Sequence, residues 1–599
     1  MKIVSQVYRI SQRELSNIPS SPLVYWISES LRVKFVSNER FASVATVKLG
    51  LSAVDVFRFN RFWWEVETSD RWYPLMKGGK FCRWYGNNDI VTNWQDNGAE
   101  AKAEVTHRYP YLKGNYKLKI RDESWLGKAG LTYTNLGGNL FSARLMPDGA
   151  LFDDTGPAIF AESMDLFTLL GLVNSTPVSY LLALLNPSIH FQKGDLEKLP
   201  IPEMVRLIEL PNLVKKCVYQ AKVRESFLET TFDFVAPIDF KSCWDVYQQI
   251  SMDLLQAEAA IDQIVSHAYE LAEDDKEAIS ELLPDVHLPS PPTSFEVAQH
   301  WISYAMGIIM GRFQPGIEDT LGCAILENEK SEKHHLFSSD VEKDLRDLAY
   351  DVNVVVLEPN HQDDLVEKVR KALILMLNED QMAEVIKAIG GDIHNFEDSL
   401  HRFLERDYFL KVHLKWYQNR PIYWLLQSPK KNYSVYLYHE HVTRDTLPLI
   451  RGSRYLGGKL NQTRRSIDEV HTQAKAAVGH DKKRLEKELE NLSALLTDLE
   501  TFDQAIQRIL DMQNEYGKTV GWDREIDDSI ILNLAPLYEL IPSLKTELKK
   551  YWDQLVSGEY DWSYTAMHYW PSRVIEKCKT NKSYAIAHRR LDVYEGDDL

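Results

Sequence analysis

The chain has few cysteines for its length. The 599 residues contain five, at positions 82, 217, 243, 323 and 578, and no two of them form a C-x-x-C pair. A zinc ribbon or a disulfide framework needs cysteines at close, regular spacing. The sequence therefore excludes both, and its cysteine usage is typical of a protein in the reducing cytoplasm.

The sequence also lacks long hydrophobic runs. No uninterrupted apolar stretch reaches the roughly 20 residues that a membrane-spanning helix needs. The first residues, MKIVSQVYRISQRE, have no apolar core of a signal peptide. Hydrophobic residues make up 44% and charged residues 26% of the chain, which is ordinary for soluble globular proteins. We expect a cytoplasmic protein of several domains with no membrane partner.

No catalytic set or metal-ligand set is recognisable. In His439-Glu440-His441 the two histidines are spaced i, i+2 on a predicted strand, whereas zincins place them i, i+4 on a helix. Asp153-Asp154 and Asp527-Asp528 lack the spacing to a lysine that restriction nucleases show, so we interpret them as turn or cap residues. The sequence predicts no catalytic residue and no metal site, and this argues against a nuclease.

Charge is distributed unevenly along the acidic chain. The formal net charge is −18, yet residues 1–150 contain 21 Lys and Arg against 14 Asp and Glu, a net +7. Residues 251–599 contain 40 basic and 60 acidic residues, a net −20. A basic N-terminal part joined to an acidic part is compatible with a nucleic-acid recognition domain carried by a scaffold.

The pattern of periodicity predicts an α+β multidomain fold. Short strands, turns and aromatic clusters fill residues 1–160, and helices are expected over 161–186, 203–232 and 244–283. The Pro- and Ser-rich stretch 284–294 is the clearest linker. We therefore predict four parts, namely a mixed α/β recognition domain over 1–205, a helical connector over 206–283, the linker over 284–294 and a mainly helical scaffold over 295–599.

Three features are expected within the scaffold. A helix should begin after Ser294, and residues 361–410 should be helical. Residues 421–438 predict a β-hairpin with its turn at 428–432. Residues 482–510 carry leucines at heptad spacing and predict a coiled-coil-like helix, for which packing within its own domain is slightly favoured over pairing with another chain.

Several sequence words occur in an order that resembles a known family. They are LVYWISES at 23–30, RFNRFWWEV at 58–66, KGGKFCRWYGNN at 77–88, FSAR at 141–144, LNPSIHFQKGDLEKLPIP at 185–202, YWPSRV at 569–574 and SYAIAH at 583–588. These words resemble those of the large adenine-specific DNA methyltransferases of type IIG and of BREX phage-defence systems, the PglX family. The resemblance runs from about residue 20 to about residue 590.

Two motifs of that family are missing from the chain. The family's methyltransferase half has a Gly-rich S-adenosylmethionine loop and an Asn-Pro-Pro-Tyr loop that grips the flipped adenine. Here the only Asn-Pro pair is Asn186-Pro187, and no aromatic residue follows it directly. Gly137-Gly138 and Gly390-Gly391 lack the Gly-x-Gly spacing. The resemblance therefore implies the C-terminal half of such an enzyme, with S-adenosylmethionine bound by a missing or partner half and no cofactor in this chain.

Basic and aromatic residues of the N-terminal part are the candidate DNA-binding residues. Lys and Arg neutralise phosphates, Arg can grip guanine, and Asn can read adenine in the major groove. The alternative for each residue is packing, with Arg stacked on an aromatic ring. The candidates are Arg58, Arg61, Arg83, Trp84, Tyr85, Asn87, Asn88, Arg108, Arg121, Lys128, Arg144 and Lys193.

The functional hypothesis is DNA target recognition for a BREX-type N6-adenine methyltransferase, in a split, truncated or fragment chain that is not catalytic alone. The expected partners are double-stranded DNA, a methyltransferase half or subunit, and other BREX or restriction-modification proteins. The alternative is a stand-alone DNA-binding specificity or scaffold subunit that does not take part in methyl transfer.

Overall fold

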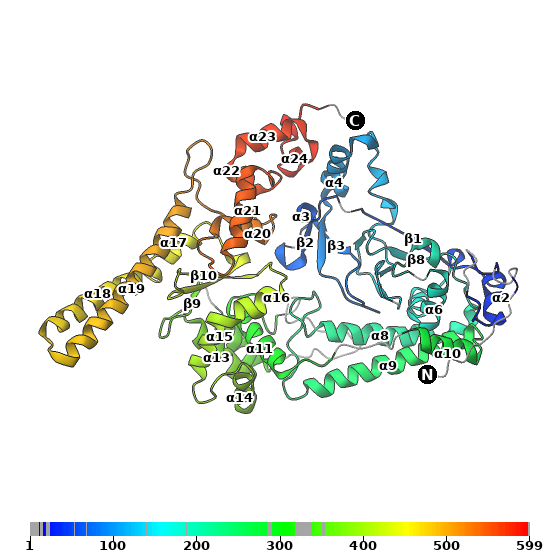
Figure 1. Ribbon diagram of the computed structural model, residues 1–599, viewed down its shortest axis with the longest axis horizontal. Helices are drawn as coiled ribbons and strands as arrows, with labels where there is room; N and C mark the ends of the chain where they lie inside the picture. Colours follow the sequence, from blue (N-terminus) through cyan, green and yellow to red (C-terminus); the bar gives the residue numbers. More distant parts are fainter. Residues whose placement is uncertain are drawn as a thin grey trace. The chain divides into compact units, whose positions relative to one another are not determined.

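The chain forms two compact units in the computed structural model (Figure 1). Unit 1 comprises residues 1–63, 68–233 and 242–291, and unit 2 comprises 64–67, 234–241 and 292–599. The structure describes residues 11, 16–19, 24–52, 54–67, 69–138, 140–186, 188–283, 290–317, 337–349 and 354–596. Most of the predicted linker (284–289), Cys323 and Pro187 lie outside the described residues. The predicted α+β multidomain class is confirmed.

Unit 1 contains two four-stranded sheets. The first has the order β1 (Ala45–Lys48), β8 (Ala158–Ala161), β5 (Leu131–Tyr133) and β6 (Ala143–Leu145), with every pair antiparallel. The second has the order β2 (Asn60–Phe62), β4 (Ile90–Asn93), β3 (Trp72–Met76) and β7 (Leu151–Phe152). Its pair β3–β7 is parallel and the other two are antiparallel. These short strands agree with the short strands and turns predicted over residues 1–160.

Helix α4 (Gln95–Arg108) follows the second sheet. Its first turn has left-handed backbone at Asp96, Asn97 and Gly98, residue types that tolerate a positive φ. A side chain at Gly98 would meet the Trp94 ring at 2.6 Å, so glycine also allows the turn to pack on that ring. Glu100 and Glu104 are spaced i, i+4 beyond this turn and share one buried face of the helix.

The helix predicted over 161–186 is two helices, and the single-helix prediction was wrong. α5 (Leu166–Asn174) and α6 (Thr176–Leu185) meet at a bend of 66°. Ser175 makes the break because its hydroxyl accepts a hydrogen bond from the Val178 amide and Pro177 follows in the first turn. No single helix of the described residues has the length and apolar character of a membrane span, although this bent pair passes that test jointly.

Further helices of unit 1 contribute to its core. α8 (Leu210–Glu225), α9 (Cys243–Ala268) and α10 (Glu273–Leu282) follow the short α7 (Lys193–Leu196). α8 packs on α5 and α9. One hydrophobic core joins the first sheet to α5, α6, α8 and α9, so the predicted connector helices share a core with the predicted recognition domain.

Unit 2 is mainly helical around a small sheet. α11 (Ser294–Ile309) begins at a Thr293–Glu296 capping box, which confirms the helix expected after Ser294. The region 361–410 is helical, as predicted, in α13 (Leu365–Met376), α14 (Glu379–Ala388), α15 (Phe396–Phe403) and the π-helix η7 (Leu404–His413). The hairpin is confirmed by antiparallel β10 (Tyr423–Gln427) and β11 (Ser434–Tyr438), and β9 (Val355–Val356) extends the sheet.

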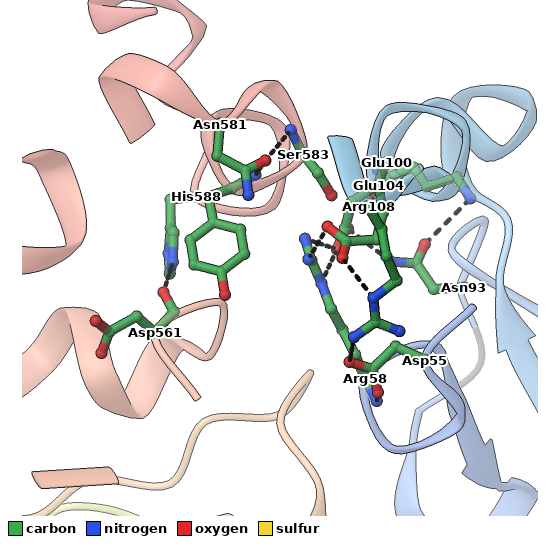
Figure 2. A network of polar contacts seen from close by, with 12 residues as sticks. Asp55, Arg58, Asn93, Glu100, Glu104, Arg108, Asp561, Asn581, Ser583 and His588 are labelled. Carbon is green, nitrogen blue, oxygen red and sulfur yellow. Dashed lines mark hydrogen bonds and ion pairs between the residues drawn. The ribbon is translucent and has the colours of Figure 1, made fainter. Parts of the chain in front are cut away.

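The predicted coiled-coil-like helix is α19 (Gly479–Leu510). It packs against α18 (Leu456–Ala476) as an intramolecular helical hairpin, which confirms the packing within its own domain that the sequence analysis favoured. After α19 come α20 (Ile530–Leu534), α21 (Lys545–Ser557), α22 (Tyr564–Tyr569), α23 (Pro571–Thr580) and α24 (Lys582–Ala587). Before α22, the buried Asp561 pairs with Arg573 and Lys577 at 2.7 Å each. The Asp561 carbonyl oxygen lies 2.8 Å from His588 Nε2, as Figure 2 shows.

Residues 64–67 are an early segment of the chain that forms part of unit 2. Trp64 Nε1 donates a hydrogen bond of 3.2 Å to the Arg420 carbonyl, and the Trp64 ring packs on Tyr417. The buried Glu65 carboxylate accepts hydrogen bonds of 3.1 Å from Ser529 Oγ and from the amide of Ile530, the first residue of α20. Unit 2 therefore requires these residues for a complete core.

Candidate nucleic-acid interface

Residues 107–128 form a basic lobe at the end of α4. Three short 3₁₀ helices make it: η3 (Pro110–Leu112), η4 (Tyr116–Leu118) and η5 (Glu123–Trp125). Lys113 and Gly114 both have positive φ, and this turn reverses the chain between η3 and η4. Leu112 and Ile120 anchor the lobe in a core that includes Trp94 and Val105.

The outer face of the basic lobe is rich in cations. Six Lys and Arg lie between residues 107 and 128, against the two acids Asp122 and Glu123. Arg108, Lys113, Lys117 and Lys128 are exposed, while Lys119 and Arg121 are half-buried. Tyr111 and Leu118 are 70% and 58% exposed beside them. Exposed Lys and Arg can neutralise the phosphates of a nucleic acid, and an exposed aromatic ring among them can contact a base.

Some of these cations already have partners within the protein. Arg108 pairs with Asp55 at 3.5 Å and with Glu104 at 3.8 Å, and Arg121 lies 3.9 Å from Asp154. Lys119 lies over the Tyr109 ring at 4.9 Å, and Lys128 lies over the Trp125 ring at 4.3 Å. Lys113 and Lys117 form no ion pair with any described residue. These two lysines are the best placed to bind an external phosphate.

Arg58 and Arg61, by contrast, are buried. Arg58 donates to Glu100 through Nε (3.1 Å) and Nη2 (2.9 Å) and to Glu104 through Nη1 (2.9 Å), as Figure 2 shows. Asn93 Nδ2 donates to the other oxygen of Glu100 at 2.8 Å. Arg61 donates from Nη1 to the carbonyls of Phe57 and Asn60 at 2.7 and 2.8 Å. In the described structure both guanidinium groups organise the protein interior.

The predicted triplet Arg83-Trp84-Tyr85 is also buried. Trp84 Nε1 donates to Glu258 of α9 at 2.6 Å, and Arg83 Nη1 lies 3.7 Å from the same carboxylate. Burial raises the pKa of Glu258, and Arg83 and Trp84 oppose that rise. Tyr85 donates its hydroxyl to Asp233 at 2.7 Å. The triplet thus joins this part of the chain to α9 and to Asp233.

Arg144 is fully buried and supports an exposed turn. Its Nη2 donates to the carbonyls of Lys77 and Gly78, the latter at 3.0 Å, and its Nη1 lies 3.4 Å from Thr134 Oγ1. Burial lowers the pKa of the Arg144 guanidinium. Asn87 Nδ2 donates to the Lys80 carbonyl at 2.9 Å. These bonds hold residues 77–81, which we name the glycine turn.

The glycine turn presents side chains that the sequence analysis did not select. Lys80 is exposed and Phe81 is 48% exposed. Asp153 stabilises the turn. Its carboxylate accepts a hydrogen bond of 2.7 Å from the Lys77 ammonium group and one of 3.0 Å from the Gly156 amide. The signal was Lys77-Gly78-Gly79-Lys80-Phe81 itself, in which two glycines between lysines indicate a close, outward-facing turn.

The two remaining candidates lie apart from the basic lobe in the sequence. Asn88 is half-buried, and Lys193 is half-buried at the start of α7, where it pairs with Glu197 at 3.5 Å. DNA contacts by the twelve candidate residues stay predictions. Arg108, Arg121 and Lys128 are the three of them that the structure places on the basic lobe.

The structure has cavities of very different size. One of about 40 Å³, lined by Leu51, Leu75, Trp94 and Ile120 among others, is far smaller than S-adenosylmethionine, whereas one of about 770 Å³ lies in unit 2 beside Met382 and Phe396. The predicted absence of a cofactor from this chain stays a prediction. A side chain at Gly137 would meet the Phe191 ring at 2.9 Å, and one at Gly391 would meet Ser399 at 2.6 Å, so these two glycines serve packing. Within the described ranges no group of three His, Cys, Asp or Glu side chains could hold a metal ion.

Comparison with known proteins identifies two relatives. No family model matches the chain. It is 24% identical over 590 residues to the adenine-specific methyltransferase BrxX of Escherichia coli O9:H4 (strain HS), an alignment that covers 89% of this chain and 46% of that protein. It is 24% identical over 586 residues to the adenine-specific methyltransferase PglX of Lacticaseibacillus casei (strain Zhang), covering 89% and 45%. The chain spans about half the length of these relatives, and the similarities support its resemblance to the BREX methyltransferases.

Proposed function

We propose that this chain is the DNA target-recognition part of a BREX-type adenine-specific (N6) DNA methyltransferase in phage defence. Methyl transfer would then depend on a partner half or subunit that carries the S-adenosylmethionine loop and the Asn-Pro-Pro-Tyr loop. The observation that carries this proposal is an alignment over 89% of the chain with less than half of two methyltransferases, in a sequence without either motif.

The described strands add support for a division of labour. Adenine methyl transfer needs a cofactor and an aromatic clamp in one cleft. Dinucleotide-like cofactors bind at the carboxyl edge of a largely parallel sheet. Among the described strands the only parallel pair is β3–β7, in which two residues of each strand are paired. In our proposal the partner would supply the chemistry and this chain would supply binding.

Unit 1 would bind duplex DNA through the basic lobe. Lys113 and Lys117 would neutralise phosphates, and the core beneath Leu112 and Ile120 would hold them in place. Phosphate contacts fix the register of a protein on DNA but carry no sequence information. Base reading would fall to other exposed side chains of unit 1, with Phe81 and Tyr111 as the aromatic candidates.

Binding of a fluorescent duplex by the full chain, measured by anisotropy between about 50 and 300 mM salt, tests the surface. K113A/K117A should weaken binding equally for all duplex sequences and reduce the slope of log K against log salt by about 1.8, because each lost phosphate contact removes about 0.9. The matched control is K371A/K411A, which removes two exposed, ion-paired lysines of unit 2. Equal affinity of the two variants would contradict the proposed surface.

Reconstitution tests the role in methylation. The full chain mixed with a subunit that carries the Asn-Pro-Pro-Tyr loop should restore adenine methylation, and the methylated sequence should follow the present chain. The alternative is a stand-alone specificity subunit, which the absence of both methyl-transfer motifs also favours. DNA binding that persists while no methylation is restored by such a subunit would favour that alternative.

A further inference from the structure

The helical hairpin of α18 and α19 has a basic end. The two helices lie side by side and extend away from the rest of unit 2, as Figure 1 shows. α19 has 32 residues, which corresponds to about 48 Å of helix. We name the hairpin the arm, and residues 471–487, which contain the connection between its helices, the tip.

The charge of the tip is opposite to that of its surroundings. Lys475, Lys482, Lys483, Arg484 and Lys487 are all exposed, against the two acids Asp481 and Glu486. The tip has a net charge of +3, within residues 251–599 that have a net −20. A cluster of this sign is not explained by average composition, because acids outnumber bases three to two in that part of the chain.

The lysines of the tip do not hold the two helices of the arm together. A small core of Val470, Ala474 and Leu485, with Leu489 and Leu492 against it, joins the two helices. Arg484 lies 3.8 Å from Asp481 across one helical turn, an exposed pair of little energetic weight. Among the described residues Lys475, Lys482, Lys483 and Lys487 form no ion pair. Their charges are available to an external partner.

The composition of the tip favours phosphate over a protein surface. Protein interfaces bury apolar and aromatic anchors at their centre. The tip contains no Phe, Tyr or Trp, and its one large exposed hydrophobic residue is Val478, at 82%. Flexible ammonium groups without apolar anchors match a dense row of phosphates, which duplex DNA provides at one charge per about 1.7 Å of axis.

We propose that the tip of the arm is a second, sequence-independent contact to the DNA phosphate backbone. The proposal rests on the proposed function in one respect, that the full chain binds duplex DNA. It adds a site in unit 2, where the overall acidity argues against one. The arm would clamp or orient DNA and would leave sequence reading to unit 1.

The test compares three variants of the full chain, each with two or three substitutions, with the unmodified protein. K482Q/K483Q/K487Q neutralises the tip, and K113Q/K117Q neutralises the basic lobe. The control K371Q/K411Q/K549Q removes three charges from exposed, ion-paired lysines of unit 2 outside the arm. Anisotropy titrations over a range of salt concentrations give the slope of log K against log salt for two unrelated duplexes, and circular dichroism gives the melting temperature of each protein.

Neutralisation of the tip should reduce the salt slope by up to about 2.7, since three phosphate contacts are lost at about 0.9 each. The loss of affinity should be the same for both duplexes, and the melting temperature should equal that of the control. A tip variant that binds DNA like the control would overturn the proposal. If the lobe variant alone loses affinity, the tip proposal fails while the proposed function stands; if the tip variant alone does, the tip stands and the lobe surface falls.

An acidic protein is the competing partner. The same proteins are therefore titrated with fluorescent poly-glutamate. Loss of poly-glutamate binding by the tip variant together with unchanged DNA binding would overturn the proposal in favour of an acidic protein. No DNA binding by the unmodified chain would overturn both the tip site and the proposed function.

Discussion

Replacement of Arg144 by alanine distinguishes a packing role from a DNA contact. The guanidinium is fully buried and donates to the carbonyls of Lys77 and Gly78, with Thr134 also within 3.4 Å. R144A removes these donors and leaves a cavity beneath the glycine turn. We expect unit 1 to lose stability and the turn to lose its fixed position.

The magnitude follows from three contributions. Hydrogen bonds to a charged group contribute about 1.5–3 kcal/mol each. The cost of burying the guanidinium, which lowers the pKa of Arg144, offsets part of this. The unfilled cavity adds to the loss. A net destabilisation of about 3–5 kcal/mol results, which lowers the melting temperature by about 6–20 °C for a unit of this size.

The assay measures the melting temperature and the affinity for duplex DNA of the same purified proteins. The matched control is K80A, which changes an exposed residue of the same turn and should leave the melting temperature within about 1 °C. R144K keeps the charge but cannot reproduce the forked donors, so its stability should be intermediate. A stably folded R144A variant that loses DNA binding would refute the packing interpretation.

Three further outcomes are expected. Calorimetry of the full chain with S-adenosylmethionine at micromolar concentration should show no stoichiometric binding, and a stoichiometric heat would place a cofactor site in this chain. W64A should destabilise unit 2 by about 3–5 kcal/mol, because it empties a buried site beside Tyr417; an unchanged midpoint in urea would count against the assignment of residues 64–67 to unit 2. Burial holds the pKa of His413 and of His439 well below the ordinary value of 6.5. Both histidines are therefore neutral when folded and take up protons on unfolding, so the melting temperature should fall as the pH decreases below about 6.5. H413Q should reduce that dependence, and a melting temperature independent of pH between about 4.5 and 6.5 would contradict it.

Elements with strong local patterns were predictable from the sequence. The hairpin at 421–438 has two runs of strand-forming residues on either side of a Ser-Pro-Lys-Lys-Asn turn, and the structure has the hairpin there. The leucine spacing over 482–510 identified α19, although its partner α18 carries fewer apolar residues. The break at Ser175 was missed because the apolar run continues across it. Ser175-Thr176-Pro177 did carry a helix-start signal, which that run obscured.

The positions of the arginines depend on contacts that local patterns do not contain. Arg58 finds its partners at Glu100 and Glu104, more than 40 residues along the chain, and Arg144 finds the carbonyl of Lys77 at a separation of 67. A charge in a positive region of sequence is equally compatible with a surface or with a buried pair. Only the folded structure shows that Arg58 and Arg144 are buried while Lys113 and Lys117 are exposed.

Several of the residues that carry the resemblance to methyltransferases lie in the protein interior. The sequence words that carry it include Trp64, Arg83, Trp84 and Arg144, and all four are buried. Buried side chains are constrained by their neighbours, because an unpaired or missing group costs several kcal/mol in the interior. Exposed lysines on the basic lobe or at the tip of the arm can change at little cost in stability. A fold of this kind can therefore keep its buried residues while its exposed residues change. The proposed target recognition requires this, because the residues that read DNA would have to vary with the target.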